Sequence, residues 1–238
     1  IGETVKQAKQ IPVLINYSKG KKRYEKKPDD FDLALIEYIE NSEIPYWYPT
    51  YRMPEGFNTE QPKISHGFTH VHHFYTKRNL WVLARLVASS IYSSLKDRLL
   101  FLLSSANIHI NVMRRYQPVK PGGTPGLPGT LYVPATPVEL SPFDGIPRKI
   151  RDIKKIEINE QNSLCIESTT SANILGNVEN SNTDYIFTDP PFGGNLMYSE
   201  LNFLWEAWLK VFTNNAPEAI MNNVQQKGLL EYQELMTR

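Results

Sequence analysis

Cysteine is almost absent from this chain, which has one, Cys165, among its 238 residues. A single thiol excludes an internal disulfide, and its apolar neighbours Leu164 and Ile166 favour a small buried side chain. Long apolar runs are missing too, since no stretch approaches the roughly 18 residues that a membrane-spanning helix needs. There is no signal-peptide pattern either. The sequence therefore predicts a cytoplasmic protein with no membrane partner.

The chain also lacks an excess of charge of either sign. Its 26 Lys and Arg residues against 25 Asp and Glu residues give a formal net charge of +1. This balance gives no global argument for nucleic acid, so any such binding must rest on local clusters. One cluster lies at 19–27, where a solvated face is the simpler reading. The others supply the candidate phosphate-contacting residues, for which a solvated face is the alternative: Arg114, Arg115, Arg148, Lys149 and Arg151.

Both nucleotide-binding fingerprints are missing. The glycine-rich stretch 121–129 has several prolines, which remove the N–H groups that a phosphate loop needs. No strand directly precedes it, and no Lys-Ser or Lys-Thr pair follows it. We expect a flexible surface loop over 118–130.

A complete metal-ligand set is missing as well. His70, His72 and His73 form the one tempting cluster. Zinc sites usually take four ligands, and no cysteine pair or further spaced histidine completes this one. We expect no metal here, and we expect these histidines to lead into the next helix.

The patterning of apolar residues predicts a mixed α/β chain. Strands are expected at 11–17 and 23–26, forming a basic hairpin, and at 131–133, 163–168 and 184–188. Helices are expected at 31–41, capped by Asp29 or Asp30, and at 79–90 and 95–105, as a hairpin covering the sheet. Further helices are expected at 171–176, at 199–211 with Ser199 as N-cap, and from about Leu229. The aromatic and proline-rich stretch 44–69 is expected to be an ordered irregular loop.

One stretch, 184–195, has a full chemical rationale. Asp184–Thr188 alternates and is rich in aromatic and β-branched residues, which predicts a short buried strand. An Asp-Pro-Pro-Phe run, Asp189–Phe192, then stops the strand, because two prolines remove two backbone donors and fix two φ angles. The result is a stiff elbow at the carboxyl end of a strand, where open α/β sheets bind their ligands. Gly193–Gly194 lets the chain turn away.

This elbow resembles the Asp-Pro-Pro-(Tyr/Phe) motif of amino-methyltransferases. The flanking runs Asn195–Trp205 and His70–Leu80 look like the N-4/N-6 DNA methylase family. The resemblance implies methyl transfer from S-adenosylmethionine to the exocyclic amine of adenine (N6) or cytosine (N4) in DNA, with the target base flipped out. It implies a partial Rossmann-like methyltransferase sheet with helices, plus an insertion that carries a β-hairpin and aromatic and proline-rich loops. The implied catalytic residues are Asp189, Pro190, Pro191 and Phe192.

The elbow suits that chemistry. An exocyclic amine is a poor nucleophile, because its lone pair is delocalised into the ring. Two acceptors aimed at its N–H bonds, the Asp189 carboxylate and the Pro190 carbonyl, would favour a tetrahedral nitrogen. Phe192 offers a flat face for the base, and Asn195 a contact to a base edge or phosphate. By the resemblance, Glu167 and Ser168 lie near the adenine of the cofactor.

Much of what such an enzyme needs is not found in the sequence. No stretch matches the Asp-x-Phe-x-Gly-x-Gly element that holds the methionine part of the cofactor, and the strands expected after the catalytic helix are missing. We expect a fragment, with an accessory region at 1–75 and a partial catalytic region at 76–238. Other segments or self-association would complete the sheet. The alternative is a non-catalytic nucleic-acid-binding module derived from a methyltransferase.

Overall fold

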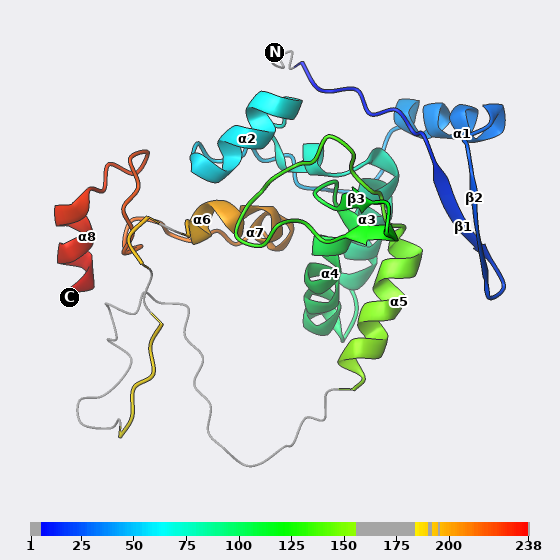
Figure 1. Cartoon of the computed structure of the whole chain (residues 1–238). Coiled ribbons are helices and arrows are strands. Elements are labelled where there is room, and N and C mark those ends of the chain that lie inside the picture. Colours follow the sequence, from blue (N-terminus) through cyan, green and yellow to red (C-terminus); the bar gives the residue numbers. More distant parts are fainter. Residues whose placement is uncertain (1–5, 156–183, 190–191, 195, 238) are drawn as a thin grey trace.

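The computed structural model describes residues 6–155, 184–189, 192–194 and 196–237. In this part the chain is mixed α/β, with helices predominating and with strands only in two small antiparallel hairpins (Figure 1). No larger sheet occurs among these residues. The strand predicted at 163–168 and the helix predicted at 171–176 lie outside the described residues.

The N-terminal hairpin and the helix after it confirm the prediction. Strands β1 (Ile15–Lys19) and β2 (Lys22–Lys26) pair antiparallel around Gly20, whose φ of +63° suits a residue without a side chain. Helix α1 (Asp30–Asn41) begins at Asp29, whose carboxylate accepts a hydrogen bond from the Asp32 backbone at 3.0 Å. The Asp32 carboxylate reaches back to the Asp29 N–H, which completes a capping box.

The core forms around the predicted helical pair, α3 (Lys77–Ser90) and α4 (Lys96–Ile110). No sheet lies under this pair in the described chain. Instead it packs with α7 (Phe203–Leu209) and with the segment that leads into α3, where Val71–Phe74 forms a 3-10 turn. The largest fully buried apolar side chains here are Phe74, Ile110, Leu131 and Leu204.

A buried series of side-chain hydrogen bonds joins the two regions on either side of the predicted boundary after residue 75. The Trp208 indole donates to the Tyr75 hydroxyl at 3.1 Å, and that hydroxyl donates to Asn107 at 2.6 Å. Burial raises the pKa of Tyr75 to about 12, although both hydrogen bonds act in the opposite direction. The core therefore includes residues from both predicted regions, and the division at residue 75 stays a prediction.

The prediction of an irregular loop over 44–69 is wrong for its second half, where α2 (Phe57–His66) forms. This helix ends at Gly67, whose N–H donates to the Lys63 carbonyl at 3.0 Å and whose φ is +71°. At its start, Gly56 has no side chain that could cap the helix. The cap comes instead from Glu200, 142 residues after Asn58, so no local pattern could have indicated it.

The loop predicted over 118–130 contains a strand. Strand β4 (Lys120–Thr124) pairs antiparallel with β3 (Arg115–Gln117). Conversely, 131–133 is not a strand, although Leu131 and Val133 are buried. The Gln61 side chain binds the Val133 N–H at 3.1 Å and its carbonyl at 3.3 Å. A side-chain amide thus satisfies the groups that a neighbouring strand would pair.

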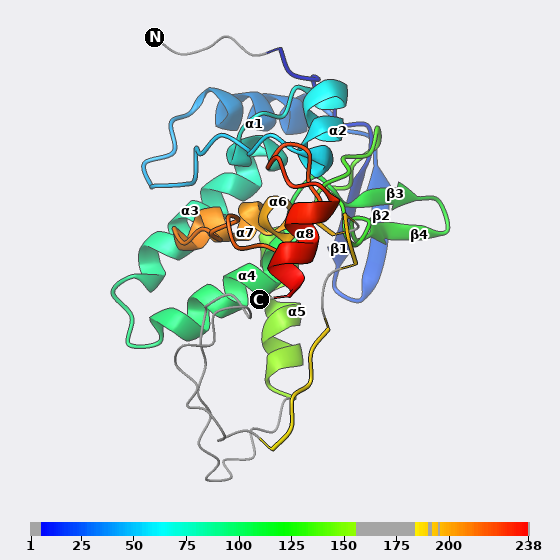
Figure 2. The same cartoon turned by 90° about the vertical axis from the view of Figure 1, so that its left-hand side faces the viewer.

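Helix α5 (Pro142–Ile153) was not predicted; it begins after the N-cap Ser141 and contains most of the basic stretch 148–155. The helix predicted at 199–211 is divided into α6 (Tyr198–Leu201) and α7. Its N-cap is Met197 rather than Ser199, because the Ser199 hydroxyl instead donates to Glu218 at 2.8 Å. The last helix, α8 (Leu229–Met236), confirms the prediction; it lies at one edge of the molecule in Figure 1 and faces the viewer in Figure 2.

Among the described residues, no helix combines the length and the apolar character needed to cross a bilayer.

Candidate functional site

The segment Asp184–Asp189 is extended but unpaired, so the predicted buried strand is wrong for the described structure. Its apolar side chains are among the most exposed, with Tyr185 at 79%, Ile186 at 72% and Phe187 at 83%. Figure 1 shows this yellow segment away from the helices. A strand is stabilised by neighbours on either side, and no described segment pairs with this one. The local pattern alone was therefore insufficient.

The predicted catalytic residues are only partly visible. Asp189 is exposed, and Phe192 is 78% exposed. Pro190, Pro191 and Asn195 lie outside the described residues, as do Glu167 and Ser168. Neither described side chain has a hydrogen-bond or ring partner among the described residues.

The chain immediately after Phe192 is fixed to the body of the protein. The Met221 N–H donates to the Gly193 carbonyl at 3.2 Å, and Gly193 has a φ of +57°. A Cβ on Gly194 would lie 3.0 Å from the Met221 carbonyl oxygen, so the close approach requires glycine. The neighbouring Ile220 is completely buried. The two glycines thus attach the chain after Phe192 to the segment Ile220–Met221.

Glu200 connects that segment to α2. Its side chain is buried, and its carboxylate accepts hydrogen bonds from the Asn58 N–H at 2.9 Å and the Asn58 amide at 3.2 Å. The Asn222 amide donates to the other oxygen at 3.2 Å. A Cβ on Gly56 would lie 2.2 Å from this carboxyl group. A negative charge at a helix N-terminus is favourable, because it meets unsatisfied N–H groups.

Sequence reasoning missed Glu200 and Asn222. The one local signal was Gly56, a helix-start residue without a capping oxygen. These residues form a continuous path from the start of α2 through Glu200 and Asn222 to Met221, and then to Gly193. They position the motif; none of them reaches Asp189.

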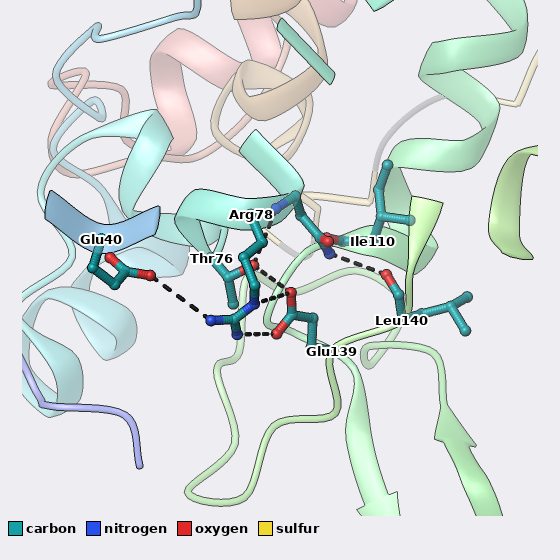
Figure 3. Close-up of polar contacts among 7 residues, drawn as sticks. Glu40, Thr76, Arg78, Ile110, Glu139 and Leu140 are labelled. Carbon is teal, nitrogen blue, oxygen red and sulfur yellow. Dashed lines mark hydrogen bonds and ion pairs between the residues drawn. The ribbon is translucent and has the colours of Figure 1, made fainter. Parts of the chain in front are cut away.

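The run His70–Leu80, which carries part of the family resemblance, forms a structural junction at the start of α3 (Figure 3). The Thr76 hydroxyl donates to Glu139 at 2.7 Å, and the Arg78 guanidinium binds the same carboxylate through Nε at 3.2 Å and through Nη2. Arg78 also lies 3.9 Å from Glu40 at the end of α1. Thr76 and Arg78 therefore join separate segments, which gives them a role in packing.

The histidine cluster is built into the fold. The rings of His72 and His73 lie 4.3 Å apart, and His73 Nδ1 accepts hydrogen bonds from the Thr69 and His70 backbones at 3.1 and 3.3 Å. Burial, followed by the neighbouring histidine charges, lowers the pKa of both His72 and His73 to about 4. Among residues placed by the structure, no group of His, Cys, Asp and Glu is arranged to hold a metal ion.

The predicted phosphate-contacting residues divide into two sets. Arg114 is buried beside β3, and burial, followed by the positive charge of Arg148 on α5, lowers its pKa. Burial also lowers the pKa of His109, and the charges of Lys149, Arg114 and Arg148 add to this effect. Arg115 is half-buried on β3, and Arg151 is exposed on α5; neither is among the charges acting on His109.

Comparison with known proteins identifies no relative: no protein-family model matches this chain, and no curated protein or solved structure does so.

Proposed function

We propose that this chain is part of an S-adenosylmethionine-dependent DNA amino-methyltransferase that methylates adenine N6 or cytosine N4 on a flipped-out base. One observation carries the proposal. The Asp-Pro-Pro-Phe run leaves Asp189 and Phe192 exposed, while Gly193 directly after it is bound to the Met221 backbone. Positioning an amine for methyl transfer requires an accessible hydrogen-bond acceptor and an accessible ring on a segment that is attached to the fold.

The proposal assigns the chemistry as follows. The Asp189 carboxylate accepts one N–H of the target amine, and the Pro190 carbonyl accepts the other, so that the nitrogen lone pair points at the methyl group. Phe192 stacks on the base. S-adenosylmethionine supplies a methyl group that its positive sulfur has already activated. The transfer forms the N–C bond and breaks the S–C bond, and the amine then loses a proton to Asp189 or to water.

The proposal includes a Rossmann-like methyltransferase sheet, of which the described residues contain no part. Residues outside the described part, other segments, or a second copy would supply its strands.

The test is methyl transfer from labelled S-adenosylmethionine to unmethylated duplex DNA by the full-length protein that contains this chain. We expect Asp189→Ala to lower the rate by about 100- to 1000-fold, the usual cost of removing one preorganised group that stabilises a transition state. Asp184→Ala is the matched control, because it removes a carboxylate from the same exposed segment and should leave the rate unchanged. Full activity in Asp189→Ala would refute the assigned mechanism.

The same assay identifies the product, since mass spectrometry of digested DNA distinguishes N6-methyladenine from N4-methylcytosine. Calorimetry of the 238-residue chain adds a separate measurement. We expect weak or absent binding of S-adenosylmethionine, because the glycine-rich cofactor element is not found in this sequence. Tight binding would show that the cofactor site is complete within this chain.

A second candidate function is a non-catalytic nucleic-acid-binding module. The exposed Arg148 and the half-buried Lys149 on α5 favour it, because these charges would serve binding without any methyl transfer. The two functions differ in one result: a module would bind DNA and would show no Asp189-dependent methylation.

A further inference from the structure

The hairpin of β1 and β2 stands at one side of the molecule, apart from helices α3, α4 and α5 (Figure 1). Only Ile15 and Lys26, which lie opposite each other at its base, are half-buried, and every other residue of the two strands is exposed. No further strand pairs with it in the described chain. A two-stranded hairpin is only marginally stable on its own in water. Both of its faces are therefore open to a partner.

The base of the hairpin is attached to the start of α1. The Lys26 ammonium lies 3.0 Å from the Asp29 carboxylate and 2.6 Å from the Asp32 carboxylate. These two aspartates also form the capping box that begins α1. At the other end, a Cβ on Gly20 would meet no atom within 4 Å. The direction of the hairpin is thus linked to the first turn of a helix, while its tip lies in open space.

One face of the hairpin holds its two strands in register. Tyr17 and Tyr24 lie directly opposite each other, and their rings stack with centroids 5.4 Å apart and planes at 22°. Cross-strand aromatic pairs of this kind stabilise an antiparallel pair of strands. Lys19 and Lys22 follow on the same face, beside the turn. We call this side the tyrosine face.

The other face carries only polar side chains. Because side chains alternate along a strand, the residues between those of the tyrosine face point the opposite way. They form two cross-strand pairs, Asn16 with Glu25 and Ser18 with Arg23, and all four are exposed. Among the described residues, none of the four side chains has a hydrogen-bond or ion-pair partner. We call Asn16, Ser18, Arg23 and Glu25 the polar face.

The polar face has the side-chain types that bind the edges of bases in DNA. Arginine binds O6 and N7 of guanine, asparagine binds N6 and N7 of adenine, glutamate accepts a hydrogen bond from the amino group of cytosine, and serine suits several bases. The major groove is about 12 Å wide and admits a two-stranded ribbon. Strands of this length extend for about 17 Å, which is enough to lie along the floor of the groove.

The charge of the hairpin also complements DNA. The stretch 19–27 has six cations and one carboxylate, Glu25. Among the described residues, Lys26 is the only one of these six cations that forms an ion pair. The other five repel one another in the free protein, and a polyanion in contact with the hairpin offsets that repulsion. A solvated face would account for the charge, but not for the attached base or for the separation of the two faces.

We propose that the hairpin enters the major groove of duplex DNA and that its polar face reads the base sequence there. Arg23 contacts a guanine, and the other members of the polar face contact neighbouring bases. The lysines around the turn contact the flanking phosphates. The inference rests on the proposed function in taking DNA as the partner, and it goes beyond that function by assigning the residues that choose the sequence.

The test is the selection of preferred sites from a library of random duplexes by the full-length protein that contains this chain. We expect Arg23→Gln to change the preference at one base pair of the selected site and to weaken binding to the parent's site by about 5- to 150-fold, the usual value of one bidentate contact. Lys22→Gln is the matched control, because it removes the neighbouring charge of β2 from the opposite face. It should leave the selected site unchanged and lower the slope of log affinity against log salt by about 1.

Three results would overturn the proposal. They are the absence of any preferred site for the parent protein, the same selected site in the parent and in Arg23→Gln, and a changed site in Lys22→Gln. Both variants should fold, because both side chains are exposed, and circular dichroism checks this.

Methyl transfer separates this inference from the proposed function. Arg23 takes no part in the transfer itself, so Arg23→Gln should keep the parent's rate at saturating DNA, whereas Asp189→Ala should not. A changed site without any methylation would support the role of the hairpin and refute the proposed function. Methylation with an unchanged site would refute only the role of the hairpin.

A single-stranded oligonucleotide distinguishes the two faces of the hairpin. We expect it to bind more weakly than the duplex, because a single strand has no groove. Tighter binding of the single strand that is lost in Tyr17→Leu with Tyr24→Leu would mean that the tyrosine face stacks on unpaired bases. That result would overturn the assignment to the polar face.

Discussion

The helical body around α3 and the segment Asp184–Thr188 both have apolar patterns that predict burial, but their outcomes are opposite. In α3, Leu80, Leu83, Ala84 and Val87 are all buried. In the motif segment, Tyr185, Ile186 and Phe187 are almost fully exposed. The difference lies in what each needs: a helix satisfies its own backbone groups, whereas a strand depends on hydrogen bonds to its neighbours.

An apolar pattern therefore indicates which face of an element is to be buried, but it does not indicate which other segment covers that face. For α3 the covering residues come from α4, α7 and the turn Val71–Phe74, all within the described chain. For the motif segment no described strand plays that part. The two regions therefore differ in their covering segments: α3 has them within the described chain, and the motif segment has none among the described residues.

The largest expected effect is a loss of stability in the helical body, and the matched control lies in the motif segment. Phe74 is fully buried in the core, so Phe74→Ala should lower the free energy of unfolding by about 3–5 kcal/mol. Phe187→Ala, the matched control at 83% exposure, should change it by less than about 0.5 kcal/mol. Urea denaturation of the chain measures both. A large loss in Phe187→Ala would show that the segment is already packed in solution.

The next prediction concerns the link between the two regions. Glu200→Gln keeps the volume of the side chain but removes the charge at the start of α2, and it leaves one nitrogen facing the donors of Asn58. We expect a loss of about 1–3 kcal/mol in unfolding free energy. Glu55→Gln is the control, since Glu55 is exposed and pairs with Lys63 at the surface. Equal effects would contradict the role given to Glu200.

The last expected effect, similar in size to that of Glu200→Gln, is a dependence of stability on pH within the body. Burial lowers the folded-state pKa of His72 and His73 to about 4. The neutral rings therefore contribute stability above the unfolded pKa of about 6.5, and this stability is lost as the pH falls towards 4. We expect a loss on the order of 2 kcal/mol by pH 4.5, allowing for solvent screening.

Carboxylates also titrate in that range, so the informative quantity is a difference. Unfolding free energies of the parent chain and of His72→Gln, measured from pH 7 to 4.5, should converge as the pH falls. Parallel curves would show that His72 is not a source of the dependence.

Elements whose signals are local could be predicted from the sequence. The hairpin at Gly20, the cap at Asp29, the α3–α4 pair and the last helix were all predicted from patterns within a few residues. The errors at 57–66 and at 131–133 share one cause: the side chain that stabilises the observed structure comes from a residue far away in the sequence. Glu200 caps α2 across 142 residues, and Gln61 takes the place of a strand beside Val133.

The candidate site follows the same division. The sequence indicated Asp189 and Phe192 by their local motif, and the structure leaves both exposed. The sequence did not indicate Glu200, Asn222 or Met221. These residues support the chain after the motif, and they come from segments that no short sequence pattern connects. Chemical groups can be recognised from a few neighbouring residues, whereas their supports depend on how the whole chain packs.

Asn79 has a consequence for how this fold can change. Its side-chain amide donates to the Ile110 carbonyl at 2.9 Å and to the Leu140 carbonyl at 3.0 Å. One residue therefore holds together the two ends of the segment 111–139. Because these ends are held, lengthening a loop within the segment costs little free energy, since each doubling of loop length costs about 0.6 kcal/mol in closure entropy. The β3–β4 turn is thus a place where new sequence could be inserted while the helical body keeps its shape.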